Sequence, residues 1–135
     1  MERDDESSLE RLLDFDRRRY WLRNDWSVRF RVYRVKAHSG RPAGIKYSFT
    51  LHDDTGERLL GFDNAHAVGA AAAFDHRHRF RNVRLVKPYD YNGPDRLLVD
   101  FFEAVETACT RDGIAFEFDD EDLLEDGLME DDDDT

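Results

Sequence analysis

The chain has 135 residues, of which 40% are hydrophobic and 38% are charged, and its formal net charge is −11. This length suits a single domain, and one cysteine, Cys109, excludes an internal disulfide framework and any multi-cysteine metal site. No apolar run approaches the ~20 residues needed to cross a bilayer, so we expect a cytoplasmic protein that makes no membrane contact.

The charge is unevenly distributed along the chain. Residues 1–16 hold two basic and seven acidic residues, and residues 112–135 hold thirteen acidic residues and no basic ones. Residues 17–111 hold eighteen basic and eleven acidic residues. A basic body is therefore flanked by two acidic ends. Such a body can attract a polyanion, while the acidic C-terminal segment solubilises it or competes for the same surface.

The N-terminal part predicts a helix followed by a strand. Residues 7–10 fit a capping box, and leucines recur after it at helical spacing, so we expect a helix to about Arg18. Aromatic residues between positions 20 and 26 are interpreted as anchors between this helix and a sheet. From Ser27 the apolar residues alternate with polar ones, which is typical of a half-buried strand.

Three strands joined by short turns predict an antiparallel meander, over residues 27–33, 45–52 and 58–62. Asp63 and Asn64 follow the third strand. The alanine-rich spacer 67–73 fits a helical turn or an ordered loop. If residues 74–80 form a strand, His76 and His78 share one face and Asp75, Arg77 and Arg79 share the other.

The C-terminal part predicts one longer helix. An apolar stripe runs from Pro94 to about Arg111, and a short strand is expected over residues 114–118. We therefore expect one α+β domain over residues 1–118, with a small, mainly antiparallel twisted sheet and two helices packed on one face. Residues 119–135 are almost all acidic and are expected to form a disordered tail.

The histidine pair within residues 75–78 carries the main functional hypothesis. His76 and His78 can exchange protons near neutral pH, and Arg77 between them can bind an anion. Metal-independent cleavage of RNA needs a base for the 2′-OH proton, a cation for the charge on phosphorus and an acid for the leaving oxygen. The alternative is that both histidines only bond the backbone or pair with acids in a polar loop.

Two further interpretations remain open. Nitrogen and oxygen ligands for a divalent ion are present, although their spacing is not that of a structural zinc site; they are His66, His76, His78, Asp63 and Asp75. A basic sheet face could instead hold a nucleic-acid backbone or an acidic partner without catalysis. Its candidates are Lys46, Arg29, Arg31, Arg79, Arg81 and Arg84.

Four sequence features, which follow one another along the chain, resemble the TumE family of toxin–antitoxin systems. They are Lys46-Tyr47 in a strand, Gly61-Phe62-Asp63-Asn64, Asp75-His76-Arg77-His78 and a Leu/Phe-rich helix, over roughly residues 25 to 110. The alanine-rich spacer is longer than the family's link, and both acidic ends are additions. The resemblance implies a small toxin neutralised by a DNA-binding antitoxin, with Lys46, Asp63, Asn64, Asp75, His76, Arg77 and His78 as candidate functional residues.

Residues and resemblance together predict a toxin that is an endoribonuclease, requires no metal or other cofactor and acts on an RNA substrate. In this hypothesis His76 and His78 transfer protons, while Asp63 or Asp75 orients one of them. The proposed substrate-binding residues are Lys46, Asn64, His66, Arg77 and Arg79. Lys46 and Arg77 would stabilise the negative charge that develops on phosphorus. The rivals are a non-enzymatic binding module and a metal-dependent nuclease.

Overall fold

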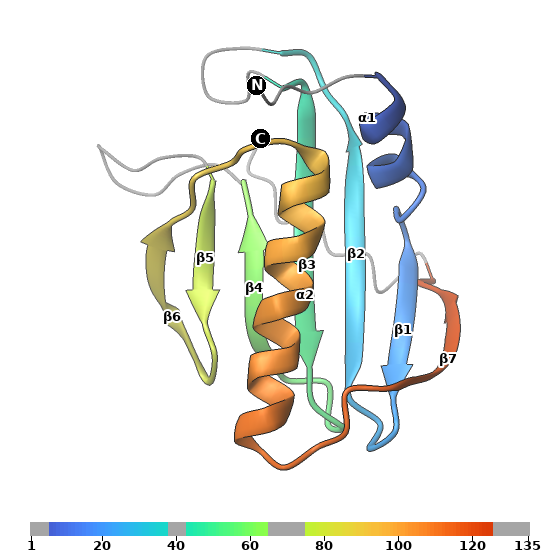
Figure 1. Ribbon diagram of the computed structural model, residues 1–135, viewed down its shortest axis with the longest axis vertical. Coiled ribbons are helices and arrows are strands. Elements are labelled where there is room, and N and C mark those ends of the chain that lie inside the picture. The colour runs from blue at the N-terminus through green and yellow to red at the C-terminus, as the bar shows by residue number, and fades with distance from the viewer. Residues whose placement is uncertain (1–5, 38–42, 65–74, 126–135) are drawn as a thin grey trace.

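The computed structural model describes residues 6–37, 43–64 and 75–125. The elements in chain order are α1 (Glu6–Leu13), β1 (Arg18–Leu22), β2 (Ser27–Arg34), β3 (Ile45–His52), β4 (Arg58–Asp63), β5 (His76–Arg79), β6 (Asn82–Pro88), α2 (Pro94–Arg111) and β7 (Phe118–Leu123). The strands form one antiparallel sheet in the order β6-β5-β4-β3-β2-β1-β7, and α2 lies across one face of it (Figure 1). The predicted α+β class and antiparallel meander are confirmed.

The core lies between the sheet and α2. Phe101 of α2 is fully buried, and its ring centroid lies 5.6 Å from those of Phe30 and Phe49 and 5.7 Å from that of Phe62. Because side chains alternate along a strand, these inward-facing aromatics leave the intervening positions of β2, β3 and β4 on the other side. We call that other side, opposite α2, the polar face.

The two helices contact each other on the covered side of the sheet. Leu9 and Leu12 of α1 belong to the same buried cluster as Leu97 and Phe101 of α2, and Arg11 pairs with an aspartate at the start of α2. Neither helix in the described part of the chain is long and apolar enough to cross a membrane.

The N-terminal helix is shorter than the sequence predicted, and a strand follows it. The helix ends at Leu13, and Arg17 adopts a left-handed conformation with φ of 71°. Its backbone N–H donates to the Phe30 carbonyl, so the chain enters the sheet at Arg18. Tyr20 and Trp21, which we expected to be anchors beside the sheet, lie within β1 itself. The prediction failed because this segment shows no clear alternation.

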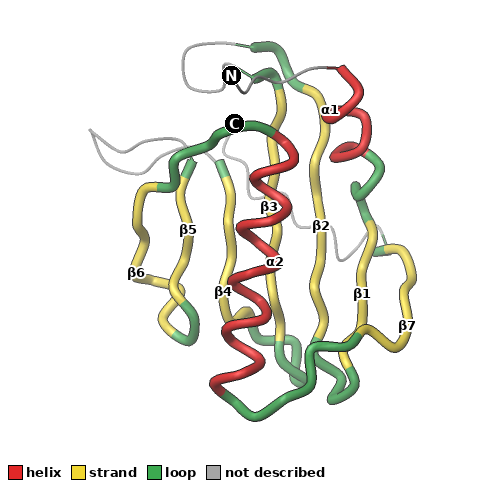
Figure 2. The backbone as a smooth tube through the Cα atoms, viewed as in Figure 1, coloured by secondary structure: helices red, strands yellow, loops and turns green. Residues whose placement is uncertain are grey.

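The last strand lies later in the chain than the sequence predicted. The strand expected over residues 114–118 is found at Phe118–Leu123. The expected boundary between the domain and the acidic tail, after residue 118, therefore follows the first residue of this strand. Acidic residues have low β-propensity, but β7 pairs with the arginine-rich β1 at the sheet edge (Figure 2). Residues 126–135 of the expected tail lie outside the described residues.

Candidate active site

Strands β4 and β5 bring together side chains from two separate segments of the chain. Asp63 is opposite His76, and Gly61 is opposite His78, in the antiparallel ladder. Directly opposed residues in such a ladder share a face of the sheet. Both imidazoles therefore lie on the polar face together with the Asp63 carboxylate.

The Asp63 carboxylate bridges the two histidines. His76 Nε2 lies 2.9 Å from Asp63 Oδ1, and His78 Nε2 lies 3.0 Å from Asp63 Oδ2. The two imidazole centroids are 5.4 Å apart, and the ring planes meet at 65°. The aspartate side chain is 9% exposed and each histidine 13%, so the cluster is shielded from bulk water but reaches the surface.

The surroundings of Asp63 keep its carboxylate ionised. Burial by itself would raise its pKa, but the hydrogen bonds and charges of His76 and His78 more than offset this effect. The pKa of Asp63 therefore lies well below its ordinary value. The carboxylate of Asp63 is therefore an acceptor for a hydrogen bond from each of the two imidazoles.

The same contacts select the tautomer of each histidine. A carboxylate only accepts hydrogen bonds, so the imidazole nitrogen that faces it carries the proton. In both rings this nitrogen is Nε2. The lone pair of each neutral ring is then on Nδ1, which is the atom that can accept a proton in a reaction.

The three side chains also present a possible metal-ligand set. One carboxylate oxygen of Asp63 and one nitrogen from each of His76 and His78 lie within 4.8 Å of one another. Two imidazoles and one carboxylate are ligands for zinc, manganese or iron. His66, another predicted ligand and substrate-binding residue, lies outside the described residues.

Asn64 is buried and binds the backbone of β3. Its Oδ1 accepts from the Tyr47 N–H at 2.9 Å, and its Nδ2 donates to the Ile45 carbonyl at 2.9 Å. The side chain thus continues the pairing between β3 and β4 beyond the last paired residue of β4. These contacts fix the end of the strand that carries Asp63.

Asp75 lies on the opposite side of the sheet from the histidines. Its Oδ2 accepts a hydrogen bond of 2.8 Å from the hydroxyl of Tyr47, whose ring is buried in the core. Burial, and then the charge of Asp75, raise the pKa of Tyr47 well above its ordinary value. This contact ties the residue just before β5 to β3.

Arg77 and Arg79 also face away from the histidines, toward α2. The Arg77 guanidinium lies 4.8 Å from the centre of the Phe62 ring. Both arginines line a cavity of about 590 Å³ between the β5–β6 hairpin and α2. The alternation expected for a strand over these residues is confirmed, and it separates Arg77 from the two imidazoles that flank it in sequence.

Lys46 lies on the polar face near Asp63. Ser48 is directly opposite Asp63 in the ladder, and Lys46 is two residues away on the same face of β3. Diagonal neighbours of this kind lie roughly 7–8 Å apart, within reach of a long side chain. Lys46 is 7% exposed, so its charge acts in a partly desolvated place.

The remaining arginines of the predicted basic surface do not all lie in the same environment. Arg31 on β2 binds Asp16 at 2.7 Å, and Arg81 pairs with Asp112. Arg29 lies opposite Thr50 on the polar face. The predicted basic surface is thus not continuous over all of its members.

Gly61, which the sequence interpretation named only as part of the motif Gly61-Phe62-Asp63-Asn64, gives His78 a cross-strand neighbour without a side chain. A Cβ at this position would lie 3.2 Å from Thr50 Cγ2 and 3.3 Å from the Phe49 carbonyl oxygen. A glycine within an otherwise apolar strand is the signal that could have identified the position.

The comparisons with known proteins give one match. The family model described as "Toxin TumE" matches residues 8–108, which include β1 to β6 and most of α2. No curated protein and no solved structure matches significantly. The match covers all described members of the site and ends before β7.

Proposed function

The chain belongs to the TumE toxin family, and from this we propose that it acts in its toxin–antitoxin system as a metal-independent endoribonuclease. The observation that supports the reaction is the carboxylate of Asp63 bridging His76 and His78. Two imidazoles held by one anion provide a proton acceptor and a proton donor in one place.

In the proposed reaction one neutral imidazole accepts the 2′-OH proton at Nδ1. The 2′ oxygen attacks phosphorus, the bond from phosphorus to the 5′ oxygen breaks, and the second imidazole, protonated, donates a proton to that oxygen. The products are a 2′,3′-cyclic phosphate and a 5′-hydroxyl. Asp63 stabilises the protonated state of each ring in turn, and the rings are 5.4 Å apart, close enough for one phosphate to contact both.

Lys46 is proposed to stabilise the negative charge on phosphorus. It shares the polar face with Asp63 and is almost completely buried, where a charge interacts more strongly than in water. Arg77, assigned the same role from sequence, lies over Phe62 on the other side, so Lys46 is the better candidate. Asp75 and Asn64 are proposed to position the strands.

The toxin family implies a cognate antitoxin as the partner of this chain. We expect that antitoxin to bind DNA and to silence the toxin by covering the polar face. A complex in which the antitoxin leaves His76 and His78 accessible would argue against this mode of neutralisation.

The test is cleavage of a mixed cellular RNA preparation by purified protein in EDTA. Wild-type protein is expected to cut, while His76→Ala and His78→Ala are expected to lose activity. Arg77→Ala is the matched control, since it alters the same strand on its other face. Undiminished cutting by both histidine variants would refute the assignment.

A metal-dependent nuclease is the second candidate. It is favoured by the convergence of three ligand atoms from Asp63, His76 and His78 within 4.8 Å. In this case EDTA abolishes cleavage by the wild-type protein, and added Mn²⁺ or Zn²⁺ restores it.

A further inference from the structure

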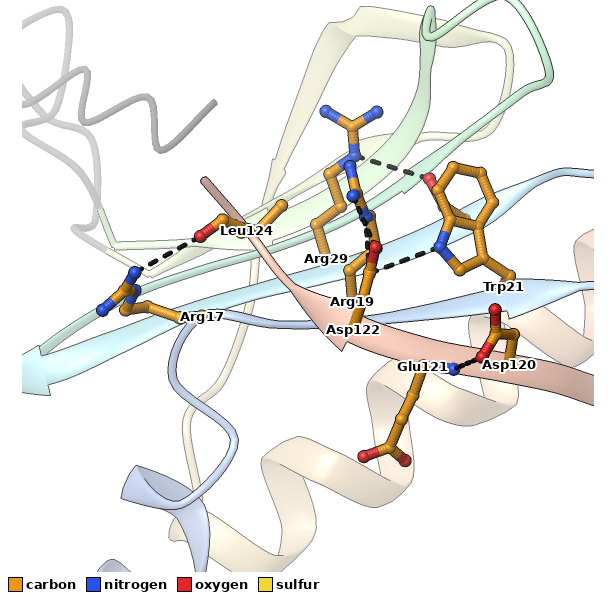
Figure 3. A network of polar contacts seen from close by, with 9 residues as sticks. Arg17, Arg19, Trp21, Arg29, Asp120, Glu121, Asp122 and Leu124 are labelled. Atoms are coloured by element: carbon orange, nitrogen blue, oxygen red, sulfur yellow. Dashed lines mark hydrogen bonds and ion pairs between the residues drawn. The ribbon is translucent and has the colours of Figure 1, made fainter. Parts of the chain in front are cut away.

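On the edge strand β7, Asp122 is held by converging donors on the polar face (Figure 3). Arg19 Nε donates to Asp122 Oδ1 at 2.9 Å, and Arg19 Nη2 donates to Oδ2 at 2.7 Å. Trp21 Nε1 donates to Oδ1 at 3.3 Å. A guanidinium binds a phosphate through the same two-pronged geometry, so the groups around Asp122 form an anion-binding site.

Arg19 has a second contact besides Asp122. The Arg19 guanidinium lies 4.8 Å from the centre of the Trp21 ring, and its side chain is only 12% exposed. Arg29 lies opposite Arg19 in the β1–β2 ladder. Hydrogen bonding to Arg19, together with the charge of Arg29, lowers the pKa of Asp122, so two arginines act on this one carboxylate.

The anion-binding site and the histidines belong to one row of directly opposed residues across the polar face. The row runs from Asp122 to Arg19, Arg29, Thr50, Gly61 and His78. Four strand spacings separate β1 from β5, which corresponds to roughly 19 Å. An extended polyanion that contacts His78 can therefore also reach Arg19.

The carboxylate that fills the site comes from a segment outside the family match. Arg19, Trp21 and Arg29 lie within residues 8–108, whereas Asp122 lies beyond them. All six residues of β7 are exposed. The strand is held by its pairing with β1 and by the buried Leu124 that follows it.

We propose that Arg19, Trp21 and Arg29 form a phosphate-binding subsite for the RNA backbone, and that Asp122 is a built-in competitor for this subsite. Naming RNA as the ligand rests on the proposed function. Asp122 would weaken substrate binding at this edge without touching the reacting atoms.

The test uses the full chain carrying His78→Ala, so that a fluorescein-labelled oligouridine RNA is bound but not cut. Asp122→Ala is expected to tighten RNA binding about fivefold. It is also expected to steepen the slope of log affinity against log salt concentration by the amount that corresponds to about one additional phosphate contact. Glu121→Ala is the matched control. It removes the same charge from the same strand, but Glu121 pairs with Arg18 on the other face, so binding is expected to change little.

A double substitution separates the subsite from a general charge effect. If Asp122 competes for Arg19, the gain from Asp122→Ala disappears in an Arg19→Ala background. Equal effects of Asp122→Ala and Glu121→Ala would overturn the inference, as would a gain that persists without Arg19 or an absence of RNA binding. Asp122→Asn, which removes the charge and keeps a polar side chain, repeats the test if the alanine variant disturbs β7. Cleavage by the chain with His78 intact is measured separately and decides the proposed function.

Discussion

Two carboxylates on the polar face, Asp63 on β4 and Asp122 on the edge strand β7, have different partners and different burial. Asp63 is 9% exposed and bridges two imidazoles, whereas Asp122 is 44% exposed and is bound by a guanidinium and an indole. Imidazole gains and loses a proton near neutral pH, and guanidinium does not. The first cluster can therefore move protons, while the second can only exchange one anion for another.

The burial of the two carboxylates also predicts different energetic consequences. Removing Asp63 leaves polar groups in a place that water reaches poorly, which is costly. Removing Asp122 exposes Arg19 to solvent at the sheet edge, which costs little. Substitutions at the Asp63 end should therefore affect both activity and stability, and those at the Asp122 end mainly binding.

The largest expected effect is the loss of proton transfer. His78→Ala is expected to lower the rate of RNA cleavage by at least about a hundredfold, the usual contribution of a general acid or base. The initial rate in EDTA measures this effect, with Arg77→Ala as control. Equal losses in the two variants would mean that the two faces of β5 do not differ in function.

Asp63→Asn tests the charge between the histidines. The pKa of Asp63 in the folded protein lies below its ordinary value of 3.8, so its ionised form contributes stability above that pH, and this contribution disappears as the pH falls below it. The variant is expected to lose about 2 kcal/mol at neutral pH and to show a flatter decline in acid. Urea unfolding across pH measures both, and an unchanged acid profile would contradict the assigned contacts between Asp63 and the two histidines.

Tyr47→Phe tests the assignment of Asp75 to positioning. The substitution removes the 2.8 Å hydrogen bond from the Tyr47 hydroxyl to Asp75 and leaves the histidines untouched. We expect a loss of about 1–2 kcal/mol in the free energy of unfolding with less than a tenfold change in cleavage. A loss of cleavage comparable to that of His78→Ala would assign Asp75 a direct part in the reaction.

The smallest effect is expected at the exposed carboxylate. Asp122→Ala should change the free energy of unfolding by no more than about 1 kcal/mol, because Asp122 is 44% exposed and such pairs are screened by solvent. Thermal unfolding at low and high salt measures it. A loss of several kcal/mol in the free energy of unfolding would show that the contacts of Asp122 are needed to hold the sheet edge together.

The central strands and the long helix could be predicted from sequence because their patterns are regular. Alternation over residues 45–52 gave the bounds of β3, and the apolar stripe gave those of α2. The pairing of β7 could not be predicted, because its acidic residues fit a strand only beside the arginines of β1. The contact of Asp63 with two histidines also depends on the β4–β5 register, and no local pattern along the chain predicts which residues of these two strands pair.

The separation of Arg77 from the histidines shows how strand geometry decides roles that residue types leave open. Arg77 lies between His76 and His78 in sequence, yet it contacts Phe62 in the covered half of the molecule. Lys46, thirty residues before His76, shares their face. The alternation of side chains along β5 was foreseeable, but the choice of strand required the three-dimensional structure.

The chemistry of the RNA ends tests the central claim most directly. Cleavage products made by the wild-type protein in EDTA are analysed for their 3′ termini by mass spectrometry, and a DNA oligonucleotide of the same sequence serves as the control without 2′-OH groups. Proton transfer by His76 and His78 predicts 2′,3′-cyclic phosphate ends on the RNA and an intact DNA strand. Products with 3′-hydroxyl ends that form only in the presence of a divalent metal would contradict it.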